Sequence, residues 1–242
     1  MIIKASELNV DDITYSPLKV LDNGAKLIWI ANKGAPLIMQ LPKMSAPFGV
    51  SRWADDKTEK YSLDLSFKGR ETDENIQKAY DMFMALDKKI IRDAMENSPA
   101  WFKKKIASVD VMEALYHPIV RQPKDDKYAP TIKLPLAYAD NAFKCLAFDA
   151  SKKVVNLADV NLKGAEVVSI VQCTGIWVAG GGAGCSWKVN QLKVFPKPSL
   201  NTYAFQDDDD EAVADADDAD AVGEERTGGA GLGCDDDDDL DI

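Results

Sequence analysis

The sequence predicts a mainly β domain with inserted helices, followed by a long acidic segment at the C-terminal end. Three observations lead to this prediction. Short runs rich in Val, Ile and Trp occur towards both ends of the first 206 residues, and a helical period occupies the middle. Acidic residues are concentrated after residue 206, where large apolar residues are few. We therefore expect one domain over residues 1–206 and a disordered acidic tail over residues 207–242.

The first strands are indicated by short apolar runs that turn residues separate. Residues 26–30 and 37–41 flank Asn32-Lys33-Gly34, where Asn and Gly readily adopt positive φ, so these two runs predict a hairpin. Residues 61–67 alternate Tyr, Leu and Phe with Ser and Asp, which is the period of a half-buried strand.

The pattern changes to a helical period after residue 72. Apolar side chains recur three or four residues apart, and Asp73 and Glu74 occupy the first turn, so an amphipathic helix is expected over residues 72–97. A shorter helix is expected over residues 109–116. It should end before Pro118, because proline disfavours the helical conformation in the residue that precedes it.

Strands return in the last third of the domain. They are predicted at residues 131–136, 143–148, 166–177 and 185–195, and a flexible glycine-rich loop at residues 178–184 should join the last two. This order fits an OB-fold, a five-stranded, partly open barrel with a helix after its third strand, here with an extra hairpin. An unrelated α+β sandwich fits the pattern nearly as well.

The distribution of charge separates the domain from the tail. The chain has 29 basic and 40 acidic residues, a net charge of −11. Residues 207–242 hold 17 of the acidic residues and one basic residue, which leaves 28 basic and 23 acidic residues, a net charge of +5, for residues 1–206. A basic domain can attract phosphate groups, and an acidic tail is typical of an interaction arm.

Several classes of function have little support in the sequence. The four cysteines form no C-x-x-C pair and there is a single histidine, His117, so we expect neither a metal site nor a cofactor, and no catalytic set. The glycine loop lacks the Gly-Lys-Ser/Thr ending of a phosphate-binding loop. The runs of Asp lack EF-hand spacing. The longest apolar run, residues 167–179, is too short to cross a membrane, so a soluble intracellular protein is expected.

Aromatic and basic residues are interleaved on the predicted strands and loops. A protein that binds single-stranded nucleic acid needs exposed rings on which unpaired bases stack, and cations that follow the phosphates. The alternative for each tryptophan is a place in the core. The candidate DNA-binding residues are Phe48, Arg52, Trp53, Lys57, Lys60, Tyr61, Lys68, Arg70, Lys103, Lys104, Lys105, Trp177, Trp187 and Lys188.

The last two predicted strands carry a family resemblance. Residues 165–177, the glycine loop and the run Cys185-Ser-Trp-Lys-Val-Asn-Gln-Leu-Lys-Val194 resemble the closing strands of the OB-fold single-stranded-DNA-binding proteins of nucleocytoplasmic large DNA viruses. Those proteins are similar to the podovirus-type phage single-stranded-DNA-binding protein, whose acidic tail ends in an aromatic residue, whereas this chain ends in Leu240-Asp241-Ile242. The resemblance implies roles in viral DNA replication, recombination and annealing, a homodimer, and a location in the host nucleus or at a cytoplasmic replication site.

The opposite charges of the two parts suggest a mechanism. A flexible tail of 36 residues spans roughly 30–36 Å, so it can reach a groove on its own domain, compete there with DNA, and recruit polymerase or helicase partners once displaced. The alternative is an acidic-tailed interaction module, such as a chaperone of basic proteins, in which the tail binds and the domain is a scaffold. An enzyme is the third possibility, because phosphoryl transfer on scattered carboxylates such as Asp64 and Asp140 stays open.

Overall fold

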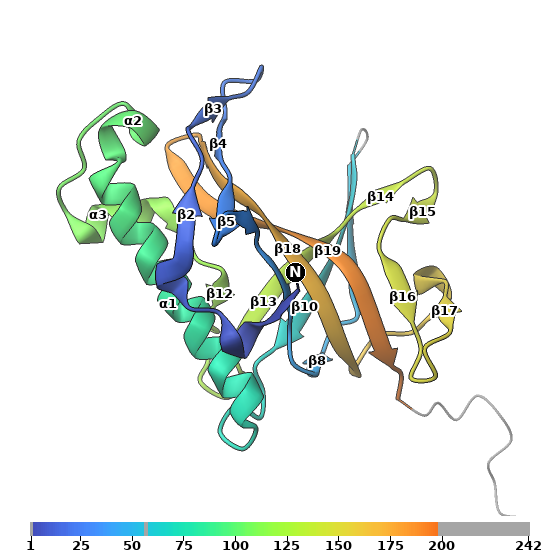
Figure 1. The fold of residues 1–242 in the computed structure, drawn as a ribbon. Helices are drawn as coiled ribbons and strands as arrows, with labels where there is room; N and C mark the ends of the chain where they lie inside the picture. The colour runs from blue at the N-terminus through green and yellow to red at the C-terminus, as the bar shows by residue number, and fades with distance from the viewer. Residues whose placement is uncertain (1, 56–57, 198–242) are drawn as a thin grey trace, which may run out of the picture. The chain divides into compact units, whose positions relative to one another are not determined.

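The computed structural model describes residues 2–55 and 58–197 (Figure 1). The predicted tail over residues 207–242 and the candidate Lys57 lie outside these residues. The described part is mainly β with a few helices, as predicted. The helices are α1 (Glu74–Glu96), α2 (Ser98–Phe102) and α3 (Val109–Leu115), with 3-10 turns η1 (Ala5–Glu7), η2 (Val10–Asp12) and η3 (Leu157–Asp159).

One large sheet dominates the fold. Its main path, in spatial order, is β12 (Val120–Arg121), β13 (Thr131–Leu136), β10 (Glu59–Ser66), β8 (Met44–Ala46), β18 (Ala165–Ala179), β19 (Gly182–Phe195), β16 (Leu146–Phe148) and β17 (Val154–Val155). Its other strands are β1 (Ile3–Lys4), β3 (Lys19–Val20), β4 (Lys26–Ile28), β7 (Ile38–Gln40), β9 (Val50–Ala54) and β11 (Tyr116–His117). Two small sheets contain β2 (Ile13–Tyr15), β5 (Ile30–Asn32) and β6 (Ala35–Pro36), and β14 (Tyr138–Ala139) and β15 (Ala142–Phe143).

The β18–β19 hairpin is the centre of the sheet and confirms the last two predicted strands. The prediction of a flexible loop over residues 178–184 is wrong, because the strands pair as far as Ala179 and Gly182. Only Gly180 and Gly181, with φ of 57° and 84°, form the turn. Gly184 is needed inside β19, since a Cβ there would lie 2.8 Å from the ring of Trp177.

The pairing predicted for the first strands is only partly correct. The turn at Lys33 and Gly34 forms, with φ of 51° and 78°, but it joins β5 to the two-residue β6. The predicted run 26–30 breaks at Trp29, whose backbone bonds Ser16 instead. Both β4 and β7 pair with β18, because this long strand offers its edge to several short ones.

The predicted strand over residues 143–148 is also only partly correct. It is divided between β15, which pairs with β14, and β16, which pairs with β19. The backbone amide of Lys144 donates to the carbonyl of Ala137 over 2.8 Å, so the chain changes partner within the run. The strand over residues 131–136 is confirmed as β13.

Both predicted helices are confirmed, and α2 is an addition. Asp73 caps α1, since its Oδ1 accepts hydrogen bonds from the amides of Asn75 and Ile76 at 2.8 and 3.3 Å. The apolar stripe of α1 is buried. The helix lies along one side of the sheet (Figure 1). The core residues of α1 are Ile76, Ala79, Met82, Phe83, Leu86, Ile90 and Ala94.

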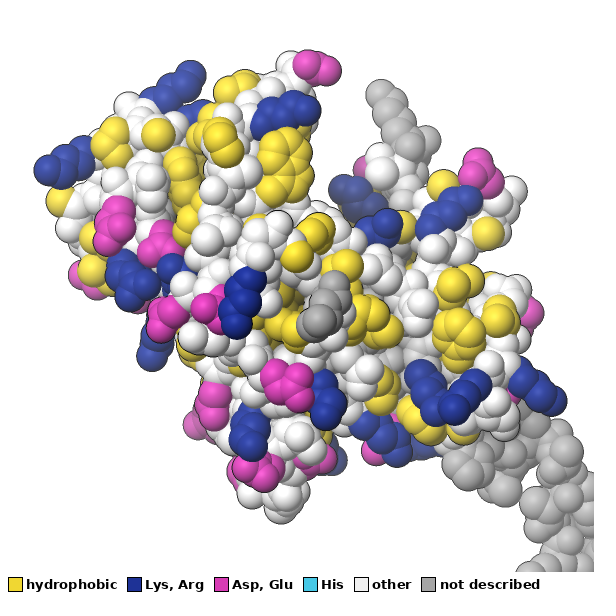
Figure 2. All heavy atoms as spheres, viewed as in Figure 1, with side chains coloured by type: hydrophobic (Ala, Val, Ile, Leu, Met, Phe, Trp, Pro, Cys, Tyr) yellow, Lys and Arg dark blue, Asp and Glu magenta, His cyan; other side chains and the backbone are white. Residues whose placement is uncertain are grey.

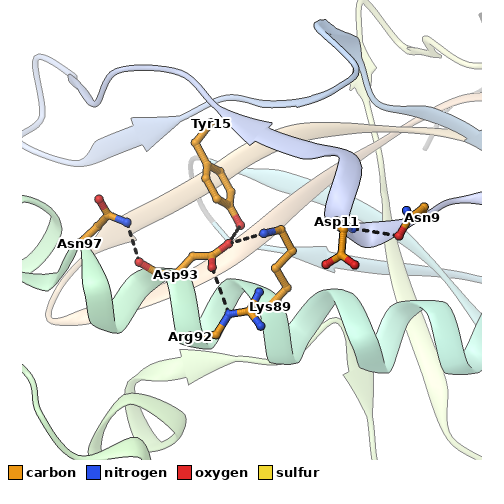
Figure 3. Close-up of polar contacts among 7 residues, drawn as sticks. All are labelled: Asn9, Asp11, Tyr15, Lys89, Arg92, Asp93 and Asn97. Carbon is orange, nitrogen blue, oxygen red and sulfur yellow. Dashed lines mark hydrogen bonds and ion pairs between the residues drawn. The ribbon is translucent and has the colours of Figure 1, made fainter.

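A buried polar cluster fixes α1 to the N-terminal strands (Figure 3). The Tyr15 hydroxyl of β2 donates to the Asp93 carboxylate over 2.6 Å, and Lys89 Nζ lies 2.9 Å from the same carboxylate. Asp93 is 8 % exposed. Burial, followed by the hydrogen bond to Asp93, raises the pKa of Tyr15 well above its usual value, so this hydroxyl stays a donor.

Candidate nucleic-acid interface

A groove of about 330 Å³ lies between β13 and β19. It is lined by residues of β11, β12, β13 and the β18–β19 hairpin, which are far apart in the sequence and meet only in the folded sheet. We call it the tryptophan groove, after the residues that define it: His117, Arg121, Lys133, Pro135, Trp177 and Trp187.

Trp177 is held in place at this groove from two sides. It lies opposite Gly184 in the β18–β19 ladder, and the absence of a side chain at Gly184 lets the indole lie against the strand. His117 is opposite the same glycine in the parallel β11–β19 ladder, and its ring centroid is 5.3 Å from that of Trp177. The half-buried indole is therefore a fixed aromatic surface.

The groove carries more positive than negative charge. Arg121 is exposed and forms no salt bridge with any described residue. Lys133 lies 3.8 Å from Asp64, a carboxylate that is largely buried on the neighbouring strand. An anionic ligand would thus meet an unpaired guanidinium and a lysine whose partner is only loosely bound.

A buried carboxylate supports the wall of the groove. Asp87 of α1 accepts hydrogen bonds from the Tyr116 hydroxyl at 2.6 Å and from the Ile119 amide at 3.0 Å. These two residues flank His117, so Asp87 fixes the segment that presents it. Burial of the carboxyl, which its hydrogen bonds offset only in part, raises the pKa of Asp87 to about 6.

Trp187 forms the floor of the groove. Its side chain is 6 % exposed, and its ring meets Phe83 of α1 edge-on, with centroids 5.5 Å apart. The indole Nε1 has no hydrogen-bond partner among the described residues. A ring buried to this extent presents no free face on which a base could stack, in contrast to the reason for choosing it from the sequence.

The β9–β10 hairpin extends the face on which the groove opens. In the ladders, Lys60 is opposite Trp53, and the alternate residue Asp64 is opposite Lys133 of the groove. Because paired residues share a face of the sheet, Trp53 and Lys60 lie on the same face as Lys133. Trp53 is 54 % exposed, and Lys60 Nζ lies 5.4 Å from its ring centroid.

Lys188 also lies on this face. Every second residue of β19 points to the same face, so Lys188 shares the face of Gly184 and Ser186. Lys188 is exposed and lies opposite Gln172 of β18. Four predicted residues are thus brought to one face, namely Trp53, Lys60, Trp177 and Lys188.

Three other predicted residues lie on the opposite face of the hairpin. Arg52 and Tyr61 are paired there, and both bond Glu59, so the Arg52 hydrogen bond holds the pKa of Glu59 below its usual value. Tyr61 packs against Tyr138 and Phe143 with centroid distances of 4.6 and 5.0 Å. Together with Phe48, which is 65 % exposed, these rings line a second hollow of about 450 Å³.

The remaining predicted cations are not gathered at either hollow. Lys68 and Arg70 lie between β10 and α1, where the Arg70 guanidinium is 4.6 Å from the ring centroid of Tyr80. Lys103, Lys104 and Lys105 are exposed in the segment after α2. They line none of the hollows described above.

Sequence reasoning missed His117, Arg121 and Lys133 as binding candidates. His117 is the only histidine of the chain, and Arg121 and Lys133 are single cations that belong to no aromatic and basic run. A periodic signal was available for Lys133, because Ile132 and Leu134 are buried and the residue between them must face outward.

Two further observations concern the described residues alone. No group of three or more His, Cys, Asp or Glu side chains is arranged to hold a metal ion within residues 2–55 and 58–197. In the same part of the chain, none of the helices has the length and apolar character required to cross a membrane.

The fold resembles solved structures from bacteriophages at low sequence identity. One is gp2.5, a single-stranded DNA binding protein encoded by bacteriophage T7, at 10 % identity and a TM-score of 0.43 over 70 % of this chain and 98 % of that chain. Another is the single-stranded DNA-binding protein of bacteriophage Enc34 in complex with ssDNA, at 10 % identity and a TM-score of 0.34 over 75 % and 92 %. A C-terminal truncation of the Enc34 protein matches at 10 % identity and a TM-score of 0.38, over 78 % of this chain and 96 % of that chain.

No curated protein matches the chain. The model of DUF5871, described as a family of unknown function, matches residues 64–207, a range that contains α1, the tryptophan groove and the β18–β19 hairpin. Since this match spans more than half of the 242 residues, the chain belongs to the DUF5871 family.

Proposed function

We propose that the chain binds single-stranded DNA without catalysing a reaction, in the tryptophan groove and along the β9–β10 hairpin. One observation carries the proposal: the fixed indole of Trp177 and the exposed indole of Trp53 share a face with Arg121, Lys133 and Lys60. Unpaired bases stack on aromatic rings while cations follow the phosphates. Duplex DNA hides its base faces, so single strands are the preferred ligand.

The proposal includes an OB-type barrel as the frame of the groove. Its support is that α1 is inserted between β10 and β13, and that the groove lies where β13 approaches β19 without forming a ladder with it. A single DNA strand that continues around the edge of the β9–β10 hairpin would reach Phe48 and Tyr61 on the other face. Roles in viral replication, recombination and annealing, and assembly as a homodimer, belong to the same proposal.

Titration with oligo-dT tests the function. We expect oligo-dT to quench tryptophan fluorescence and duplex DNA of equal length to bind more weakly. Log affinity should fall with log salt concentration with a slope near 0.7 for each phosphate neutralised. The proposal would be contradicted if oligo-dT caused no quenching and no salt-dependent binding were found at low ionic strength. A parallel titration with oligo-rU would show the preference between DNA and RNA.

The acidic residues after position 206 are proposed to compete with DNA for the groove and, once displaced, to recruit replication proteins such as polymerase or helicase. The support for this competition is the opposite charge of the two parts, −16 over residues 207–242 and +5 over residues 1–206. A variant that ends at Gln206 should bind oligo-dT more tightly than the full chain, with the largest gain at low salt because salt screens the competition. Equal or weaker binding by the truncated chain would reject this part of the proposal.

The alternative is an acidic-tailed chaperone of basic proteins, which the run of Asp and Glu after residue 206 favours. Such a protein would bind histone-like partners only when residues 207–242 are present. It would leave oligo-dT unbound even after truncation, so the same two preparations separate the two functions.

A further inference from the structure

A second exposed tryptophan lies on another hairpin, outside the site described above. Trp29 follows β4 and is 44 % exposed. Lys19 of the paired strand β3 places its Nζ 5.6 Å from the Trp29 ring centroid. Lys19 forms no salt bridge with a described residue, so its charge is unpaired.

Strand register places this pair on the face of Trp177. Lys19 is opposite Leu27, Leu27 is opposite Trp177, and Trp177 is opposite Gly184, so one row crosses β3, β4, β18 and β19. Residues opposite one another share a face. Trp29 stands two positions after Leu27, and the residues that alternate with them, Lys26, Ile28 and Ile30, are buried.

The β3–β4 hairpin therefore matches the β9–β10 hairpin in its chemistry. On each, an exposed indole lies beneath a lysine, with Nζ-to-centroid distances of 5.6 Å at Trp29 and 5.4 Å at Trp53. Figure 2 shows the surface hollowed between these two hairpins, with basic side chains on both rims. An exposed ring beside a lysine is the combination that stacks an unpaired base and contacts its phosphate.

We propose that the β3–β4 hairpin is a second base-stacking arm, which carries a single strand beyond the tryptophan groove. The inference rests on the proposed function and adds to it a position for one further unpaired base. A single DNA strand that leaves Trp177 would pass over Leu27, along the row of paired residues that crosses β18, β4 and β3. It would stack a base on Trp29 and bring a phosphate to Lys19. The two arms would then hold the strand on either side of the groove.

Oligo-dT of increasing length tests this arm on the full chain. Trp29→Ala should weaken binding of long oligo-dT roughly 10-fold and leave the shortest oligo-dT that binds unaffected, because a short strand fills the groove alone. Trp29→Phe should restore most of the affinity, since a smaller ring still stacks. Lys19→Gln should reduce the slope of log affinity against log salt concentration by about 0.7.

Val20→Ala is the matched control. Val20 lies on the same hairpin and is 60 % exposed, but its partner Lys26 is buried and it therefore belongs to the other face. The Val20→Ala variant should bind oligo-dT of every length with the affinity of the natural chain. A loss as large as that of Trp29→Ala would show that the hairpin as a whole, rather than the ring, matters, and would overturn the inference.

The outcomes separate this inference from the function beneath it. If the natural chain ignores oligo-dT, the proposed function fails and the arm fails with it. If the natural chain binds and Trp53→Ala weakens binding, but Trp29→Ala binds every length like the natural chain, the β3–β4 arm alone is rejected. Weaker binding of long strands only is the result that supports it.

Discussion

Trp177→Ala is expected to weaken the binding of oligo-dT by roughly 5- to 150-fold, which corresponds to the loss of one stacked base. Trp177 is held in the tryptophan groove between the backbone at Gly184 and the ring of His117. Because the ring is already fixed, a base that stacks on it loses little free energy in ordering the side chain. Fluorescence anisotropy of labelled oligo-dT measures the change directly.

Two variants separate the role of this ring from its contribution to folding. Trp177→Phe keeps an aromatic face and should retain most of the affinity. Gly184→Ala keeps the indole but adds a Cβ 2.8 Å from it, so the ring must move and binding should weaken. Thermal unfolding of each variant shows whether the domain stays intact. Natural affinity in an intact Trp177→Ala protein would place the binding face elsewhere.

Local structure was largely predictable from the sequence, whereas strand pairing was not. The three-to-four residue period of α1 and the Val and Ile content of β18 and β19 are signals within one segment, and both predictions are confirmed. The partners of β4 and β7 depend on which edge of β18 is free, and no short window of sequence records that. The break at Trp29 has the same origin, since it depends on Ser16.

The same distinction divides the candidate site. Trp53 and Lys60 could be chosen from one stretch of sequence, but strand alternation separates them from Arg52 and Tyr61, which were chosen with them. Trp177 and Trp187 are alike in the sequence because each lies on one of the two predicted strands beside the glycine-rich run. The packing of Phe83 of α1 against Trp187 is what makes Trp187 a core residue. Arg121 could not be associated with Trp177 before the strands were paired.

The second large effect concerns the dependence of stability on pH. Asp87 is 5 % exposed, and burial raises its pKa from 3.8 to about 6. A raised pKa means that the folded state holds the proton more tightly than the unfolded state, so this group stabilises the fold fully below about pH 4. The contribution is lost as pH rises through 6, by about 3 kcal/mol in all at 1.36 kcal/mol for each pKa unit.

Asp87→Asn removes the titration while keeping a polar side chain beside Tyr116 and Ile119. Urea unfolding of both proteins between pH 4 and pH 8 should show that the natural chain loses its advantage over the variant as the carboxyl ionises. The comparison cancels the exposed carboxylates, such as Glu59, whose pKa is lowered and whose effect on stability has the opposite sign. A constant difference across this range would show that Asp87 ionises with equal ease in both states. Because Asp87 also bonds the Tyr116 hydroxyl and the Ile119 amide on either side of His117, we expect the variant to bind oligo-dT more weakly at pH 5.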